Sequence, residues 1–472
     1  MPASYLTLFP PAMNTLQMLK GIIDWNAAFV RFGSRIASLG IEATTNHQDA
    51  AFSMIHRGLN FMPHLDILKL DRVLSAYAEN ARDLMDFIKA TLVEPLEQFY
   101  LRRKEEASFF EILTSHPSRQ GWSTPCDKNR ILCDLPSHRL IDISDDKPHR
   151  IKNYTVVFAP RAGHHSNIAE RVALFLRKQG LTRIAVVEQK CAEEIPLYVD
   201  RKRHYEGFEG QVSQYRQMLE RLAALSGHPS HLVAICQPGP LLMITLILYP
   251  HLAKTFGSAG SPMHTEGERG NLTDFARLAG EHYIDILLAV LGRTVAGGHS
   301  GAGREYYDGR LQVFGFYYLG MDQHLRNFIN LFTDLREGKK EDVERQNIFY
   351  QWYNHVHHSP VGFVRDTFKK IFINNELIRG TLSLGGKTIG INNYPASIPI
   401  WALGGKKDEI TPPQQAVGHM PLIESVPSSN KLTLLCEAGH MGLFRSSKVL
   451  DQYYGRIAEF ILANSDMGDP EI

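Results

Sequence analysis

Residues 231–249 constrain the fold more than any other part of the chain. The segment HLVAICQPGP is an apolar run that stops at Cys236 and enters a Gln-Pro-Gly-Pro turn, and the uncharged stretch LLMITLILY follows directly. A strand, a tight turn and a buried helix in this order form a nucleophile elbow, where backbone N–H groups beside the turn residue can stabilise an oxyanion. We therefore predict that Cys236 lies at a sharp turn between a buried strand and a buried helix.

The predicted elbow departs from the usual G-x-S-x-G pattern. Ala234 and Pro238 occupy the two glycine positions, and the candidate nucleophile is a thiol. A cysteine in such a place is more often a small buried hydrophobe than a nucleophile. Partner residues elsewhere in the chain must therefore decide the role of Cys236.

Two later segments supply candidate partners. SIPIWAL (397–403) is predicted to be a buried strand with Asp408 in the loop after it, and KLTLLC (431–436) is predicted to be the next strand with His440 in the following turn. Taken singly, an aspartate after a strand is more often a turn residue. An α/β-hydrolase presents nucleophile, acid and histidine in this chain order, each at the C-terminal end of a strand. The joint pattern predicts a triad of Cys236, Asp408 and His440.

An oxyanion hole is predicted from the elbow and from the loop after an earlier strand. YTVVFA (154–159) is predicted to be that strand, and PRAGHH follows it. The residue after the nucleophile usually donates one backbone N–H and this loop donates the other. We assign the first donor to Gln237 and the second to the loop at 161–163, with Ala162 and Gly163 as candidates. Gly163 alternatively serves only a turn that requires a positive φ.

These segments together resemble the intracellular polyhydroxyalkanoate (polyhydroxybutyrate) depolymerases, a family of cysteine-nucleophile α/β-hydrolases. The resemblance runs from about Tyr154 to the C-terminal helix. VAICQPGP is similar to the family's cysteine elbow, in which Cys-Gln-Pro replaces the lipase box, and this is the most specific match. The other similar stretches are VVFAPRAGHH, YYDGRLQVFGFYYLGMDQHLRNFINLFTDL, GGKKDEIT and AGHMGLF.

The resemblance implies that Cys236 is the nucleophile, Asp408 the acid and His440 the base of a polyester-cleaving enzyme without a cofactor. Two departures from the family pattern bear on substrate preference. Gly239-Pro240-Leu241 stands where a Val-Pro pair is expected, and His264 in GSPMHT stands where an aspartate is expected. Neither departure removes a residue of the predicted triad.

Four parts of the chain are predicted from the pattern of elements. Strand and helix alternate as a doubly wound, mostly parallel α/β sheet requires, and an insertion interrupts this alternation before the acid strand. The predicted parts are an N-terminal helical region (1–115), the first part of an α/β-hydrolase core (126–264), a helical cap insertion (265–394) and the C-terminal part of the core (395–472).

The N-terminal helical region has two apolar stripes at helical spacing. Two stripes on one helix favour packing on more than one side, as in a helical domain docked on the core. The alternative is attachment to a hydrophobic polymer or lipid surface. One stripe is Leu16, Leu19, Ile23, Ala27 and Val30, and the other is Trp25, Phe29, Phe32 and Ile36.

Composition excludes several classes of function. A net charge of +1 is not the strongly positive charge that is typical of a nucleic-acid-binding protein. The N-terminus has no early Lys or Arg before its apolar part, so it does not indicate a secretory signal, and no stretch is long enough to indicate a transmembrane helix. Five dispersed cysteines fit a reducing compartment. The histidines at 354–358 lack acidic or cysteine ligands nearby, so no metal is predicted. We expect a cytoplasmic protein that can associate with polymer granules.

The predicted function is an intracellular poly(3-hydroxyalkanoate) depolymerase that works through a cysteine acyl-enzyme. Its products would be 3-hydroxybutyrate, oligomers or their thioesters, with water or coenzyme A as the acyl acceptor. One alternative is a polymer synthase-like acyltransferase, but Ala234 and Pro238 replace the glycines of the G-x-C-x-G elbow expected there. The other alternative is a non-catalytic protein of the granule surface. The oligomeric state is left open.

Overall fold

The computed structural model describes residues 130–145, 149–161, 168–319, 321–353 and 355–468. The predicted N-terminal helical region and the loop residues Ala162 and Gly163 lie outside these ranges. The described residues fall into two compact units. The smaller contains 311–355, and the larger contains the described residues on either side of it.

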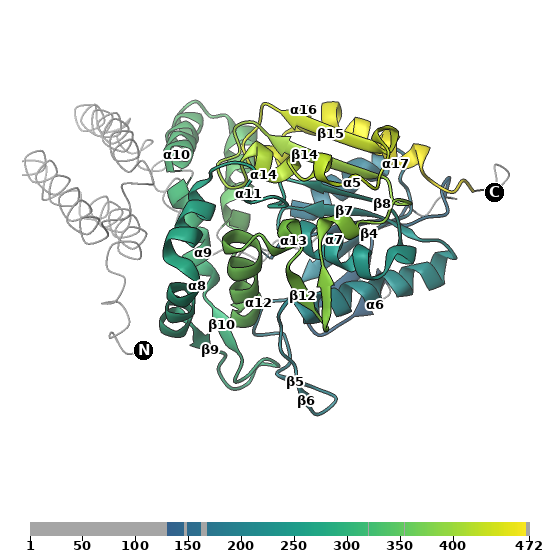
Figure 1. The fold of residues 1–472 in the computed structure, drawn as a ribbon. Coiled ribbons are helices and arrows are strands. Elements are labelled where there is room, and N and C mark those ends of the chain that lie inside the picture. Colours follow the sequence, from purple (N-terminus) through teal and green to yellow (C-terminus); the bar gives the residue numbers. More distant parts are fainter. Residues whose placement is uncertain (1–129, 146–148, 162–167, 320, 354, 469–472) are drawn as a thin grey trace, which may run out of the picture. The chain divides into compact units, whose positions relative to one another are not determined.

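The larger unit contains an eight-stranded sheet in the order β1-β2-β4-β3-β7-β8-β14-β15 (Figure 1). β1 pairs with β2 and β2 with β4 in the antiparallel direction, and the remaining pairs are parallel. This is the mostly parallel α/β-hydrolase sheet predicted from the sequence. The strands are β1 (Ile131–Asp134), β2 (His138–Asp142), β3 (Thr155–Phe158), β4 (Ile184–Gln189), β7 (Ser230–Ile235), β8 (Ala253–Ala259), β14 (Ile400–Gly405) and β15 (Lys431–Cys436).

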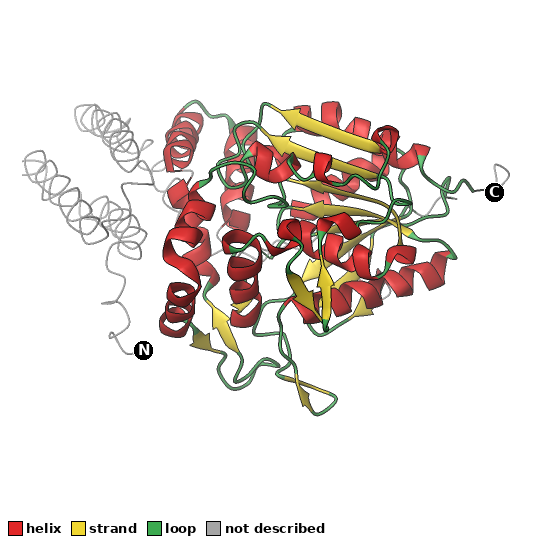
Figure 2. Ribbon diagram, viewed as in Figure 1, coloured by secondary structure: helices red, strands yellow, loops and turns green. Residues whose placement is uncertain are grey.

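Helices lie on both faces of the sheet (Figure 2). On one face α6 (Phe208–Ser226) packs against α7 (Pro238–Leu248), and α7 is buried along most of its length because its sequence has no polar side. On the other, α5 (Ile168–Lys178) packs against the segment Leu450–Tyr454. The C-terminal helix is not uniform, since the π-helical segment Leu450–Tyr454 directly precedes α17 (Gly455–Ala463).

A large and a small residue fit together across two central strands. Trp401 on β14 is fully buried and pairs in register with Gly257 on β8. A Cβ atom built on Gly257 would lie 1.9 Å from the indole of Trp401, so only glycine leaves room for this ring. The core packing therefore fixes β8 and β14 side by side, and both strands end near the candidate site.

The insertion between β8 and β14 is largely helical, as predicted. α8 (Asn271–Leu291) packs against η5 (Thr367–Ile373), and α12 (Val361–Asp366) contacts both. These three elements belong to the same compact unit as the sheet. The remaining elements of the insertion in this unit are β9 (Arg293–Thr294), β10 (Glu305–Tyr307), β11 (Ser359–Pro360), α13 (Glu376–Arg379), β12 (Leu382–Leu384), β13 (Lys387–Ile389) and the 3₁₀ turn η6 (Ile391–Asn393).

The smaller unit contains a helical pair from the same insertion. α9 (Gly309–Leu319) leads into α10 (Met321–Arg336) and α11 (Lys340–Tyr353), which pack against each other. Leu331 and Phe332 form its apolar centre. The ring of Tyr317 lies 4.8 Å from that of Tyr353, so aromatic contacts join α9 to α11. That the insertion forms a cap with boundaries at residues 265 and 394 stays a prediction.

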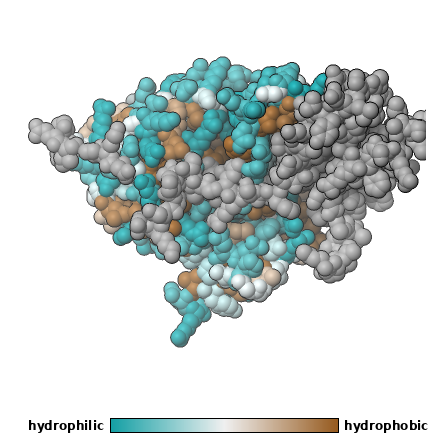
Figure 3. Space-filling model, turned by 180° about the vertical axis from the view of Figure 1, so that it is seen from behind, coloured by the Kyte–Doolittle hydropathy of each residue, from teal (hydrophilic) through white to brown (hydrophobic). Residues whose placement is uncertain are grey.

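The remaining elements are short. A hairpin of β5 (Tyr198–Val199) and β6 (Lys202–Arg203) has a hydrophilic tip that stands out at the lower edge of Figure 3. None of the described helices is long and apolar enough to cross a membrane. The short helices of the C-terminal part are α14 (Pro413–Val417), α15 (Gly442–Arg445) and α16 (Ser447–Val449).

Gly257→Ala is expected to lower the free energy of unfolding, because the added methyl group displaces the indole of Trp401. Overpacking of this kind costs about 1–3 kcal/mol, which urea unfolding can measure. Gly455→Ala is the matched control, since a Cβ atom there meets nothing within 4 Å and alanine is the better helix former. Equal stability of the Gly257 variant and the wild type would contradict this packing.

Acid is expected to destabilise the larger unit because it contains histidines that are buried in the neutral form. Burial lowers the pKa of His231 and His419 to about 3 and that of His138 to about 4. Below pH 6.5 the unfolded chain binds protons that the native protein excludes, so stability falls with pH by up to about 1.4 kcal/mol per histidine per pH unit.

His419→Leu should therefore reduce the loss of unfolding free energy between pH 7 and pH 5. The control is His251→Gln, at an exposed position, which should leave that loss as in the wild type. The same pH dependence of stability in His419→Leu and wild type would contradict the burial of His419 in its neutral form.

Candidate active site

Cys236 lies at the turn between β7 and α7, where the sequence predicts an elbow. Its φ is +60°, in the left-handed region, which only four non-glycine residues of the described chain adopt. Gln237 is the N-cap residue of α7, and Pro238 is the first residue of the helix. A side chain in this backbone region is strained by about 1–3 kcal/mol, and such strain is common at active sites.

Backbone contacts on both sides hold the turn at Cys236. The Cys236 N–H donates to the carbonyl of Ala259 at 2.9 Å, and the Gly239 N–H donates to the carbonyl of Cys236 at 3.3 Å. A Cβ atom on Gly239 would lie 2.6 Å from Ser261. Gly239 thus lets the first turn of α7 approach the loop after β8, which keeps the thiol at the end of the sheet.

Asp408 and His440 meet at the ends of β14 and β15. Asp408 Oδ2 lies 2.8 Å from His440 Nδ1, and both side chains are buried. The other carboxylate oxygen accepts the backbone N–H groups of Ile410 at 3.0 Å and Thr411 at 2.7 Å. The aspartate is therefore fixed by its own loop and directs one oxygen to the imidazole.

The imidazole of His440 is packed on two sides. A Cβ atom on Gly260 would lie 3.2 Å from its Cε1, and the Phe444 ring is 5.5 Å away in a T-shaped arrangement. Burial alone would lower the pKa of His440, but the Asp408 carboxylate and the hydrogen-bonded thiol of Cys236 raise that pKa well above its ordinary value. The structure thus brings the three predicted triad residues together, and their electrostatics favour the imidazolium that forms when His440 accepts the thiol proton.

One predicted oxyanion donor is open at the start of α7. No described residue accepts a hydrogen bond from the Gln237 N–H. Prolines at 238 and 240 have no N–H to offer, and the N–H of Gly239 is engaged with the carbonyl of Cys236. An oxygen anion formed at Cys236 would therefore meet the Gln237 N–H as its donor from the elbow.

The second predicted donor lies outside the described residues, since Ala162 and Gly163 do. The structure describes Arg161, whose backbone N–H donates to the side-chain Oε1 of Gln237 at 3.1 Å. Because the Arg161 N–H is already hydrogen-bonded, Ala162 and Gly163 stay the predicted donors in this loop.

His264, at a position where the resemblance led us to expect an aspartate, lies in the loop after β8. Its Nδ1 is 3.2 Å from Asn375 Nδ2, and burial lowers the pKa of this imidazole. The nearby residues Ser261 and Met263 pack against Gly239, whereas the His264 side chain contacts Asn375 of the insertion. The departure therefore lies beside the site without replacing a triad residue.

Sequence reasoning missed the residues that hold the triad in place. The contacts of Gly260 with His440 and of Arg161 with Gln237 join segments far apart in the chain, and no local pattern predicts them. The N–H donors of Ile410 and Thr411 were detectable in principle, because an aspartate often accepts such bonds in a turn of its own loop. Among the described residues, no group of three or more His, Cys, Asp or Glu side chains is arranged to hold a metal ion.

One family of known proteins matches part of the chain. Residues 260–465, just under half of the chain, match the family described as PHB de-polymerase C-terminus. The matched residues include Asp408 and His440 and begin after Cys236. Among curated proteins, no sequence matches this chain.

Solved structures similar to this chain include lipases and an esterase. A soluble variant of monoglyceride lipase from Saccharomyces cerevisiae is 10% identical over 74% of this chain and 100% of its own, with a TM-score of 0.45. The monoacylglycerol lipase of Paleococcus ferrophilus is 14% identical over 69% and 98%, with a TM-score of 0.39. A thermophilic esterase from Thermogutta terrifontis is 9% identical over 70% and 94%, with a TM-score of 0.36. All three TM-scores are below 0.5, and the strand order of the sheet defines the fold.

Asp408→Asn is expected to lower the pKa of His440 toward its ordinary value, because the variant removes the carboxylate that stabilises the imidazolium. The amide oxygen can still accept the N–H bonds of the loop, so the local fold should persist. The ring signals of His440, followed by NMR from pH 5 to 10, would titrate at lower pH in the variant. Titration at the same pH in both proteins would contradict the role of Asp408.

Proposed function

We propose a function on the premise that this chain is a PHB depolymerase-type α/β-hydrolase, given its strand order and the family match over residues 260–465. The proposed activity is cleavage of poly(3-hydroxyalkanoate) esters through a cysteine acyl-enzyme. The observation that carries it is the thiol of Cys236, at a strained elbow, beside the buried pair of Asp408 and His440.

The first half-reaction forms a thioester on Cys236. The thiol proton passes to His440, and the sulfur attacks the ester carbonyl carbon while the carbonyl π electrons move to the oxygen. The N–H of Gln237, together with a donor from Ala162 or Gly163, stabilises this oxyanion. The oxyanion then collapses, the carbon–oxygen ester bond breaks, and His440 protonates the departing hydroxyl group. Asp408 holds the imidazole in the orientation that both transfers need.

The second half-reaction releases the acyl group to an acceptor. Water, deprotonated by His440, would give 3-hydroxybutyrate or a short oligomer, and a thiol such as coenzyme A would give an acyl thioester. In either case the thiol of Cys236 is restored. A thioester can pass its acyl group to both kinds of acceptor, which is one consequence of a cysteine in place of serine.

The proposed setting is the cytoplasm, at the surface of polymer granules. The substrate would be the polymer itself, and no cofactor or metal takes part in the proposed steps. The helical insertion before the acid strand is proposed to act as a cap, in keeping with its place in the chain.

Two other functions are open to direct test. A synthase-like acyltransferase would extend polymer when supplied with hydroxyacyl-coenzyme A, whereas the proposed depolymerase would not. A non-catalytic granule protein would bind polymer without turnover, and that binding would survive substitution of Cys236, Asp408 and His440 together. The buried and hydrogen-bonded state of Asp408 and His440 favours an active site over a decayed one.

Cys236→Ala is expected to reduce product release from amorphous poly-3-hydroxybutyrate by roughly 10³-fold or more, because no nucleophile remains. Released 3-hydroxybutyrate and oligomers are measured by chromatography, with thermal unfolding as the check of folding. Cys133→Ala, at another free cysteine, should release product as the wild type does. Undiminished release by the Cys236 variant would rule out the mechanism.

A further inference from the structure

The side chain of Gln237 has a contact that the proposed chemistry does not use. No described residue accepts a hydrogen bond from the backbone N–H of Gln237, but the side-chain Oε1 accepts the backbone N–H of Arg161 at 3.1 Å. Arg161 lies just after β3, the strand beside β7 in the sheet. The residue that follows the nucleophile is therefore tied by its side chain to the segment that follows the neighbouring strand.

Two carbonyl groups hold the guanidinium of Arg161. Its guanidinium donates to the carbonyl of Lys190 at 2.6 Å and to that of Ser137 at 3.2 Å, and it lies 5.8 Å from the ring centre of Phe363. The residue is only 3% exposed. Since the Lys190 N–H also donates to Ser137 at 2.9 Å, the two acceptors are joined to each other.

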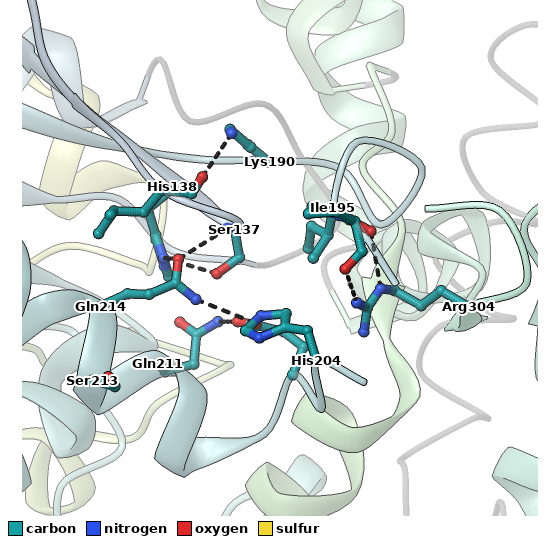
Figure 4. A network of polar contacts seen from close by, with 12 residues as sticks. Ser137, His138, Lys190, Ile195, His204, Gln211, Ser213, Gln214 and Arg304 are labelled. Atoms are coloured by element: carbon teal, nitrogen blue, oxygen red, sulfur yellow. Dashed lines mark hydrogen bonds and ion pairs between the residues drawn. The ribbon is translucent and has the colours of Figure 1, made fainter. Parts of the chain in front are cut away.

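A buried carboxylate offsets the charge of Arg161. Glu206 is 1% exposed and contacts His204 at 2.6 Å, and His204 and Arg161 lower its pKa in spite of burial. Figure 4 shows part of this polar network, in which the side chain of Gln214 points to Ser137. Gln214 donates to Glu206 at 3.4 Å and accepts the Ser137 N–H at 2.9 Å.

These contacts form an unbroken hydrogen-bonded path to the elbow, which runs from Glu206 through Gln214, Ser137, Arg161 and Gln237. Every link except the last is buried. A buried arginine whose donors are spread over two carbonyls has little freedom to move, so the Arg161 N–H is a fixed donor for Gln237. A surface hydrogen bond to the same glutamine would not give this rigidity.

We propose that Gln237 and Arg161 are positioning residues, in which the side-chain bond between them fixes the Gln237 peptide so that its N–H points at the oxyanion. This inference rests on the proposed function, because it assigns a second role to a residue of the proposed oxyanion hole. The need for such a device is geometric. A donor stabilises an oxyanion only at about 2.7–3.1 Å, and a displacement of about 1 Å can cost roughly 10²-fold in rate.

Gln237→Met tests the proposal, because it keeps the length of the side chain and removes the acceptor. We expect kcat for a soluble 3-hydroxybutyrate ester to fall roughly 10- to 100-fold with KM within about twofold. Gln217→Met, at an exposed position on α6, is the matched control and should match the wild type. Gln237→Met should reduce kcat much less in the Arg161→Met background than in the wild-type background, since the two residues act as a unit.

Two reagents test stabilisation of the oxyanion separately from the reactivity of the Cys236 thiol. A trifluoromethyl ketone analogue of the substrate forms a hemithioketal when the thiol sulfur bonds to the carbonyl carbon, the carbonyl π electrons move to oxygen, and the thiol proton goes to His440. Iodoacetamide alkylates the same sulfur with loss of iodide and forms no oxyanion. Gln237→Met should weaken inhibition by the ketone in proportion to its loss of kcat/KM and leave the rate of alkylation within about twofold.

The results distinguish the inference from the function on which it rests. The positioning role is overturned if Gln237→Met and the wild type bind the ketone equally well. It is also overturned if Gln237→Met slows alkylation as much as it weakens ketone inhibition. In both cases the proposed function stands. Failure of the wild type to form the hemithioketal at Cys236, seen by ¹⁹F NMR, overturns the proposed function itself.

Discussion

The left-handed backbone at Cys236 is the constraint on which the rest of the site depends. A non-glycine residue with a φ of +60° would relax if its neighbours allowed it, so the fold must hold the turn from both sides. The carbonyl of Ala259 at the end of β8 accepts the Cys236 N–H, and Gly239 brings α7 against the loop after β8. The strain is offset by the packing of α7, which is buried because it has no polar face.

The same sheet edge brings the other groups to this turn. β14 is the parallel neighbour of β8, and β15 is the parallel neighbour of β14, so the loops after both strands open at the edge where Cys236 lies. Gly257 makes this order compatible with a fully buried Trp401 between the strands. Asp408 and His440 thus reach the site as a consequence of strand order, and the missing side chain of Gly260 leaves room for the imidazole.

Local patterns in the sequence predicted the parts of the structure that depend on local chemistry. The runs at 231–235 and 431–436 are strands because they are apolar and bounded by turns, and the loops after them contain Cys236 and His440. The π-helical segment at Leu450–Tyr454 and the split of the insertion between two compact units were not predictable, because tertiary packing determines both. The bond between Arg161 and Gln237 joins residues 76 positions apart, and no periodicity reports such a contact.

The central claim is that the sulfur of Cys236 carries the acyl group during ester cleavage. Mass spectrometry of the protein, quenched in acid after brief exposure to a 3-hydroxybutyrate ester, tests this most directly. The account predicts a hydroxybutyryl mass increase on the peptide that contains Cys236, removed by hydroxylamine as a thioester is. Turnover with no adduct on that peptide, or an adduct on another residue, would contradict it.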